Sequence, residues 1–144
     1  MTTARQVGPA ALVDRLRQAT NDHDLEVLID CFAPDYRNET PVHPERGFTG
    51  RDQVHKNRTQ IFAAIPDVTT DVLACAVDGD IVWSEWEHRG TRRDGSRHLM
   101  RGVIILGVVE GRAAWARFYL EPVQPGGGGV DEAVHRQVRP GGTL

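Results

Sequence analysis

Three polar side chains recur at alternate positions of the segment 35–41, whose sequence is DYRNETP: Tyr36, Asn38 and Thr40. Alternate residues of a strand point to the same face, and a buried face is normally apolar. The segment therefore predicts either an exposed edge strand or a strand that presents hydrogen-bonding groups to a cavity. In a cavity, a phenol, an amide and a hydroxyl could orient a substrate oxygen or a water molecule. The structural alternative is a polar strand that fixes the loop after it.

His88 is the titratable group that we place on the apolar face of the predicted sheet. An imidazole has an ordinary pKa of about 6.5, which suits general acid–base catalysis. Trp86 and Phe118 would form aromatic walls beside it, and Ser84 could orient a polar group of the ligand. A histidine on an apolar face can equally be a structural residue that packing holds in place.

Helical periodicity predicts three helices in the first half of the chain, over residues 9–22, 25–32 and 51–65. Pro9 suits the first turn of the first helix, and Pro66 stops the third. The segment 41–50 between the polar strand and the third helix reads as a loop. The third helix carries its apolar residues at Val54, Ile61, Phe62 and Ile65.

The second half predicts an antiparallel meander. Strand-like segments at 68–77, 81–91, 96–109 and 112–123 are separated by Asp-Gly or Glu-Gly turns, which are hairpin signals. The glycine-rich segment 125–129 predicts a flexible break, and residues 130–138 could add a short helix. We therefore expect one domain over residues 1–124 and a flexible tail over residues 125–144.

The turns predict which side chains meet. A three-residue loop with a left-handed Gly111 places Phe118 opposite Gly102. The turn at 94–95 places His88 opposite Met100. Asp71 would approach His88 if the turn at 78–80 were a two-residue loop, whereas the three-residue loop that we favour sends it to the other face. The predicted concave face comprises Ser84, Trp86, His88, Met100, Gly102, Ile104, Ala116, Phe118 and Leu120.

The composition of the chain argues against two classes of binding partner, nucleic acids and membranes. The chain has 144 residues, a net charge of −3 and a basic content of 17 residues, with no basic stripe, so we expect no nucleic-acid partner. No apolar run approaches the roughly 20 residues of a membrane span, and no signal peptide is evident, so we expect a cytoplasmic protein and no membrane partner. Lys56 is the only lysine, a bias typical of GC-rich bacterial genomes.

Metal and cofactor motifs are missing from the sequence. There is no HExxH, no GxGxxG and no P-loop, so we expect no metal and no cofactor. Cys31 and Cys75 form no CxxC pair, and we expect both to be reduced thiols in the core.

The order of elements resembles the NTF2-like superfamily, particularly its SnoaL-like members, over residues 9–123. The residues that carry the resemblance are the helix-to-strand junction NDHDLEVLIDCFAPDY at 21–36, the helix start at 50–52 and the closing hairpin EGRAAWARFYLE at 110–121. The resemblance implies an α+β fold. In this fold a curved antiparallel sheet forms a cone, which three N-terminal helices close around an apolar pocket.

Two chemistries of the superfamily are not carried over. Tyr36 and Asn38 resemble the pair that holds the attacking water in limonene-epoxide hydrolases, but by our alignment the accompanying Asp-Arg-Asp set is His88, Trp86 and Phe118 here. The ketosteroid isomerases use a carboxylate base immediately before a proline, a position that Thr40 occupies in this chain. Their oxyanion-hole positions fall near Leu16 and Gly102, which donate no side-chain hydrogen bond.

We therefore expect a cofactor-independent enzyme of the cyclase, isomerase or hydrolase type that acts on a hydrophobic small molecule. The alternative is a non-catalytic module that shelters an apolar ligand. His88, Tyr36 and Asn38 are the candidate catalytic residues. The candidate substrate-binding residues are Leu16, Thr40, Phe62, Ser84, Trp86, Met100, Ile104, Phe118 and Leu120.

The outer face of the predicted sheet favours a homodimer. It mixes paired charges with the apolar residues Trp83, Val103, Ile105, Trp115 and Tyr119. An apolar area of this size is unusual on a monomer, so we expect a two-fold pair through this face.

Overall fold

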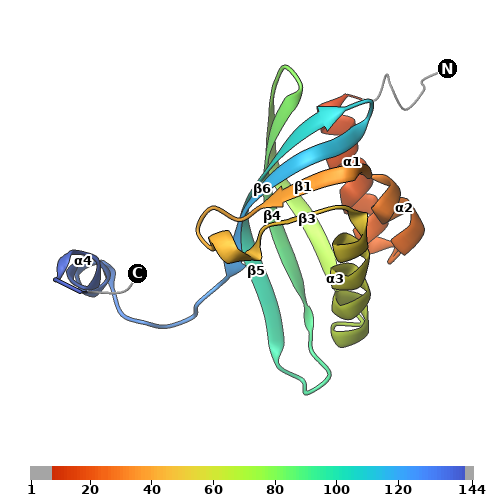
Figure 1. Ribbon diagram of the computed structural model, residues 1–144. Coiled ribbons are helices and arrows are strands. Elements are labelled where there is room, and N and C mark those ends of the chain that lie inside the picture. The colour runs from red at the N-terminus through yellow and green to blue at the C-terminus, as the bar shows by residue number, and fades with distance from the viewer. Residues whose placement is uncertain (1–7, 142–144) are drawn as a thin grey trace.

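The computed structural model describes residues 8–141, and it shows an α+β fold with a curved six-stranded sheet (Figure 1). The elements are α1 (Pro9–Asn21), α2 (Leu25–Asp30), β1 (Phe32–Glu39), the 3-10 helix η2 (Pro44–Arg46), β2 (Phe48–Thr49), α3 (Arg51–Ala64), β3 (Thr69–Asp78), β4 (Ile81–Thr91), β5 (Arg97–Val109), β6 (Arg112–Pro122) and α4 (Val130–Val138). The three predicted helices and the four-strand meander are thereby confirmed.

Local signals explain where the helices begin. Pro9 occupies the first turn of α1, where its missing N–H costs nothing. The Asp24 carboxylate accepts a hydrogen bond from the Val27 backbone N–H at 3.2 Å and caps α2. α3 follows Gly50, whose φ of 96° lies in the left-handed region that glycine adopts without strain.

The strand order across the sheet is β2-β1-β6-β5-β4-β3. The meander from β3 to β6 is antiparallel, and β1 joins the outer side of β6 in a parallel pairing. β2 covers the remaining edge of β1 with a short antiparallel pairing. The polar strand is therefore an internal strand, and the exposed-edge explanation for its composition is wrong.

Register between β4 and β5 follows the prediction, because His88 faces Met100 and Trp86 faces Gly102. Between β5 and β6 the prediction is wrong by two residues: Phe118 faces Ile104, and Gly102 faces Leu120. Positive φ angles at Glu110 and Gly111 form a two-residue turn, and a bulge at Ala114 then restores the side chains to their expected faces.

A second bulge decides where Asp71 points. The turn between β3 and β4 is a two-residue loop, since Asp78 pairs with Ile81. A bulge at Leu73 reverses the alternation, so that Asp71 faces Glu87 on the outer side of the sheet. There the Asp71 carboxylate accepts a hydrogen bond from Arg89 at 2.6 Å. Asp71 is therefore on the opposite face from His88, as favoured, although the loop length that we expected was wrong.

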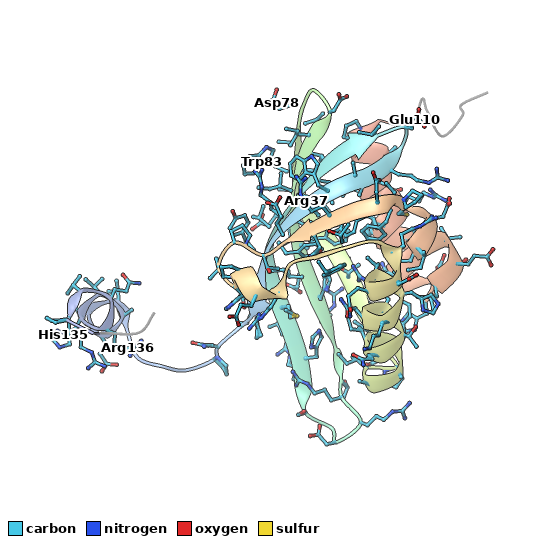
Figure 2. All side chains as sticks on the ribbon, in the orientation of Figure 1. Arg37, Asp78, Trp83, Glu110, His135 and Arg136 are labelled. Atoms are coloured by element: carbon cyan, nitrogen blue, oxygen red, sulfur yellow. The ribbon has the colours of Figure 1, made fainter. Side chains whose placement is uncertain are left out.

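The helices α1, α2 and α3 lie on the concave side of the sheet, and α3 runs across its open half (Figure 1). The core between them is apolar, with Leu12 and Leu28 fully buried against the strands. After β6, an extended segment leads to α4, which stands apart from the sheet with His135 and Arg136 on its surface (Figure 2).

The two cysteines have different surroundings. Cys31 is buried beside α2, whereas Cys75 is exposed on the edge strand β3. The expectation of two core thiols is therefore wrong for Cys75. None of the helices within residues 8–141 is long and apolar enough to span a membrane.

Candidate functional site

A cavity of about 360 Å³ lies between the concave face of the sheet and α3. Fifteen residues line it: Phe32, Tyr36, Asn38, Thr40, Arg46, Phe48, Val54, Asn57, Arg58, Ile61, His88, His98, Met100, Phe118 and Leu120. A smaller space of about 20 Å³ shares four of these residues and is completed by Leu16, Thr20, Trp86, Ile104 and Leu106. The larger cavity is the candidate ligand site, because its volume falls within the usual range of about 300–1,000 Å³.

β1 supplies two of the polar groups. The Tyr36 hydroxyl donates a hydrogen bond to Oδ1 of Asn38 at 2.7 Å, and both side chains are buried. Burial raises the pKa of Tyr36 well above its ordinary value, so the phenol stays protonated. With Oδ1 engaged, the Asn38 amide nitrogen is left to donate to a ligand.

Thr40 combines the two roles considered for the polar strand. It lines the cavity, and its hydroxyl donates a hydrogen bond to the His43 carbonyl oxygen at 2.8 Å. The His43 imidazole contacts the Glu121 carboxylate at 2.7 Å, which ties the loop after β1 to the end of β6. Arg46 follows in the same loop and lines the cavity from η2.

His88 lies where the two cavities meet, on β4. Its ring packs edge-on against Trp86 with centroids 5.9 Å apart. Burial lowers the pKa of His88 to about 3, assisted by the positive charges of Arg58 and His98. At neutral pH the imidazole is therefore neutral, and the pKa of His88 lies well below the ordinary value of about 6.5.

Arg58 is the main residue that sequence reasoning missed. It lies on α3 beside Asn57, and both line the larger cavity. A readable signal was present, because positions 54, 57, 58 and 61 follow the spacing of one helix face. The sequence-based prediction for this helix names only the apolar members of that face and leaves out Arg58.

The guanidinium of Arg58 faces the cavity without a partner from residues 8–141. Arg58 takes part in none of the ion pairs among these residues. Its pKa is affected only by burial and by the neighbouring Tyr36 and Cys31. Burial lowers the pKa of Arg58, which nevertheless remains cationic because its ordinary pKa is so high. Within the same residues, every sealed side-chain nitrogen or oxygen has a hydrogen-bond partner, so the Arg58 nitrogens are accessible from the cavity.

The remaining predicted substrate-binding residues divide between the two spaces. Met100, Phe118 and Leu120 line the larger cavity. Leu16, Trp86 and Ile104 line the smaller one.

Two of the predicted cavity residues lie elsewhere. The Ser84 hydroxyl accepts a hydrogen bond from the Trp86 indole at 2.8 Å and donates one to the Ile104 carbonyl oxygen at 2.7 Å. Its polar group is therefore used within the sheet. Phe62 stacks on His23 with ring centroids 4.5 Å apart and lies outside both spaces. The prediction that these two residues line the cavity is wrong, since internal contacts already use both side chains.

In the part of the chain that the structure describes, residues 8–141, no group of three histidine, cysteine, aspartate or glutamate side chains could hold a metal ion. The polar groups of the cavity are instead phenol, amide, imidazole and guanidinium groups. They can donate hydrogen bonds to an oxygen atom, and the neutral His88 can accept a proton.

A protein-family model described as a SnoaL-like domain matches residues 13–122. A search of curated proteins finds no significant match. Among solved structures, IdmH from Streptomyces antibioticus, whose assignment as a polyketide cyclase is provisional, is 23% identical with a TM-score of 0.67. The alignment covers 79% of this chain and 91% of IdmH.

Two further structures show the same architecture. A protein of ketosteroid isomerase-like fold from Catenulispora acidiphila, in complex with trimethylamine, is 18% identical with a TM-score of 0.66 and coverage of 78% of this chain and 87% of that protein. An NTF2-like protein of unknown function from Exiguobacterium is 18% identical, with a TM-score of 0.64 and coverage of 78% and 98%. At these identities the likeness concerns the fold.

Proposed function

The chain belongs to the SnoaL-like domain family, and on that premise we propose that it is a cofactor-independent enzyme for a hydrophobic small molecule. A cyclisation or isomerisation in the larger cavity is the favoured reaction, and a hydrolysis is the next candidate. The observation that carries the proposal is the composition of the cavity. Apolar atoms form most of its wall, and Tyr36, Asn38 and His88 add polar groups to the same lining.

Each polar group has a role that its surroundings support. Tyr36 holds the Asn38 amide in one orientation, so that the amide nitrogen can donate a hydrogen bond to a substrate oxygen. His88 is the candidate proton carrier, because its neutral imidazole can take a proton from the carbon adjacent to the carbonyl group that bears this oxygen and return it to another carbon of the resulting enolate. Phe118 and Met100 supply apolar wall against which the body of the substrate would pack.

A binding module is the second candidate function, and one observation favours it. Catalytic bases are usually oriented by a third group, but no side chain from residues 8–141 forms a hydrogen bond with the His88 imidazole. The carboxylates that superfamily members use are also absent from the corresponding positions of our alignment, which hold Thr40, His88 and Phe118.

The experiment that separates the candidates begins with a thermal-shift screen of hydrophobic polycycles and polyenes. Compounds that raise the melting temperature are then incubated with the protein and analysed by mass spectrometry and NMR. An enzyme yields a rearranged or hydrated product in an amount that exceeds the protein many times. Saturable binding with quantitative recovery of each unchanged compound would contradict the enzymatic proposal and favour the binding module.

A further inference from the structure

The charged side chains that line the cavity are of one sign. Within residues 8–141, the side chains that line the two spaces include Arg46 and Arg58 but no aspartate or glutamate. Two acidic groups on the outer side of the sheet are already engaged in ion pairs there. Glu87 pairs with Arg101 at 2.6 Å, and Glu39 pairs with Arg117 at 3.1 Å. A ligand in the cavity therefore meets positive charge that no neighbouring carboxylate cancels.

Arg58 is the lining residue on which this excess of positive charge has the largest effect. The titratable groups that interact electrostatically with it are Tyr36, Cys31 and His88, and none of them supplies a negative charge at neutral pH. Burial raises the pKa of the Cys31 thiol to about 11 and raises the pKa of the Tyr36 phenol still further above the neutral range. Arg58 is half-buried, and a positive charge that is partly withdrawn from bulk water without a counter-charge destabilises the fold, a cost that a bound anion would offset.

Other arginines that pack against the protein are paired with a carboxylate, as is usual for a partly buried positive charge. Arg15 and Arg112 both bind the Asp30 carboxylate, at 2.8 Å and 2.9 Å. Arg58 differs because the space that such a carboxylate would fill is part of the cavity. The Asn38 amide, which can donate a hydrogen bond, lines the same cavity.

We infer that the ligand of this cavity is an apolar acid whose carboxylate binds the Arg58 guanidinium. The inference rests on the proposed function, since it assigns the chemical class of the molecule that the cavity takes. A planar guanidinium matches the geometry of a carboxylate and can bind it with two parallel hydrogen bonds. The apolar body would pack against Ile61, Met100, Phe118 and Leu120, which come from α3, β5 and β6.

An acid in this position would also change His88. The charged or titratable groups that face the imidazole are Arg58 from α3 and His98 from β5, and both oppose its protonation. A carboxylate on Arg58 offsets that positive charge, so the pKa of His88 rises when the acid binds. A substrate of this class would therefore prepare the proton carrier that the proposed reaction needs.

The test compares two probes of equal size, 2-naphthoate and 2-naphthamide, by isothermal titration calorimetry at pH 7. Both have two fused rings, and only the acid carries a charge. We expect the wild-type protein to bind the acid roughly 10- to 100-fold more tightly than the amide, as a charge-assisted hydrogen bond requires. Arg58→Met should abolish this preference and leave the affinity for the amide nearly unchanged.

Two further variants isolate the cause. Lys56→Met removes the same charge from an exposed position of the same helix, so it should keep the preference for the acid. Arg58→Lys should restore part of the preference that Arg58→Met loses, because it returns the charge without the planar geometry. A Lys56→Met protein that loses the preference as fully as Arg58→Met would show long-range attraction instead of binding by Arg58, and would overturn the inference.

The wild-type protein alone already gives a decisive comparison, whatever the stability of the variants. Equal, saturable binding of the acid and the amide would overturn the inference and leave the cavity as a ligand site. Failure of both probes to bind at about 1 mM, the weak end of specific recognition, would count against the cavity as a ligand site. The proposed function would then fail together with the inference.

Discussion

The Tyr36 hydroxyl donates its hydrogen bond to Asn38, two residues further along β1, and the 2.7 Å contact lies inside the wall of the cavity. Removing the hydroxyl leaves the buried Asn38 oxygen without its partner. We therefore expect Tyr36→Phe to lower the free energy of unfolding by about 1–3 kcal/mol in urea titrations. Tyr119→Phe, on the exposed outer face of β6, should change it little. Equal effects of the two substitutions would contradict this account of the pair.

His88 should make stability depend on pH. Its folded-state pKa of about 3 lies below the ordinary value of 6.5, so protonation favours the unfolded chain. The contribution of the neutral imidazole is fully present above pH 6.5 and is lost as the pH falls toward 3. One proton corresponds to a slope of up to about 1.4 kcal/mol per pH unit.

Urea unfolding at pH 7 and pH 5.5 measures this slope. Carboxylates titrate mostly below this pH interval. His88→Gln should make the free energy of unfolding depend less on pH over this interval, because glutamine does not titrate. His55→Gln, at an exposed position of α3, is the matched control and should leave this dependence unchanged. A parallel loss of stability in the wild type and His88→Gln would show that His88 is not the depressed group.

The outer face of the sheet supports the expected homodimer, which we propose as the state in solution. Trp83 is 50% exposed, and Figure 2 shows it on the side of the sheet away from the helices. Ile105, which we expected in this patch, is already buried within one chain. Charges of both signs, such as Glu87 and Arg101, let a two-fold pair place the patch against itself.

Light scattering at micromolar concentration should give about twice the 16.0 kDa mass of one chain. Trp83→Glu introduces a charge within the proposed contact and should shift the protein to a single chain. Gln60→Glu adds the same charge to an exposed position of α3 and should leave the mass unchanged. A wild-type mass of 16 kDa would exclude the proposed pair at that concentration.

Periodicity and turn residues were enough to predict the helices, the meander and the face of each strand that carries His88, Trp86 and Phe118. The register of β6 could not be predicted, because the turn has two residues where we expect three, and the bulge at Ala114, which has no local sequence signal, shifts the pairing by one residue more. The same is true of the bulge at Leu73, which turns Asp71 outward. The type of a hairpin turn determines which residues of the two strands pair only as far as the first bulge, because the extra residue of the bulge shifts the register beyond it.

The site was predicted less completely than the fold. Alternation on β1 indicated Tyr36 and Asn38, and both line the cavity. Arg58 was missed because an arginine on a helix usually lies in solvent, and only the three-dimensional position of α3 turns it inward. The depressed pKa of His88 depends on burial and on Arg58, which is 30 residues earlier in the sequence.

The most direct test of the proposed function is the turnover of a converted compound by His88→Gln. Removing a general acid–base group typically lowers the rate by about 10²–10⁴-fold. We predict a loss of that size while calorimetry shows that the compound still binds, because glutamine keeps a side chain of similar size at this position and the rest of the cavity wall is unchanged. Wild-type turnover by the His88→Gln protein would contradict the assignment of His88 as the proton carrier, and with it the mechanism proposed for this cavity.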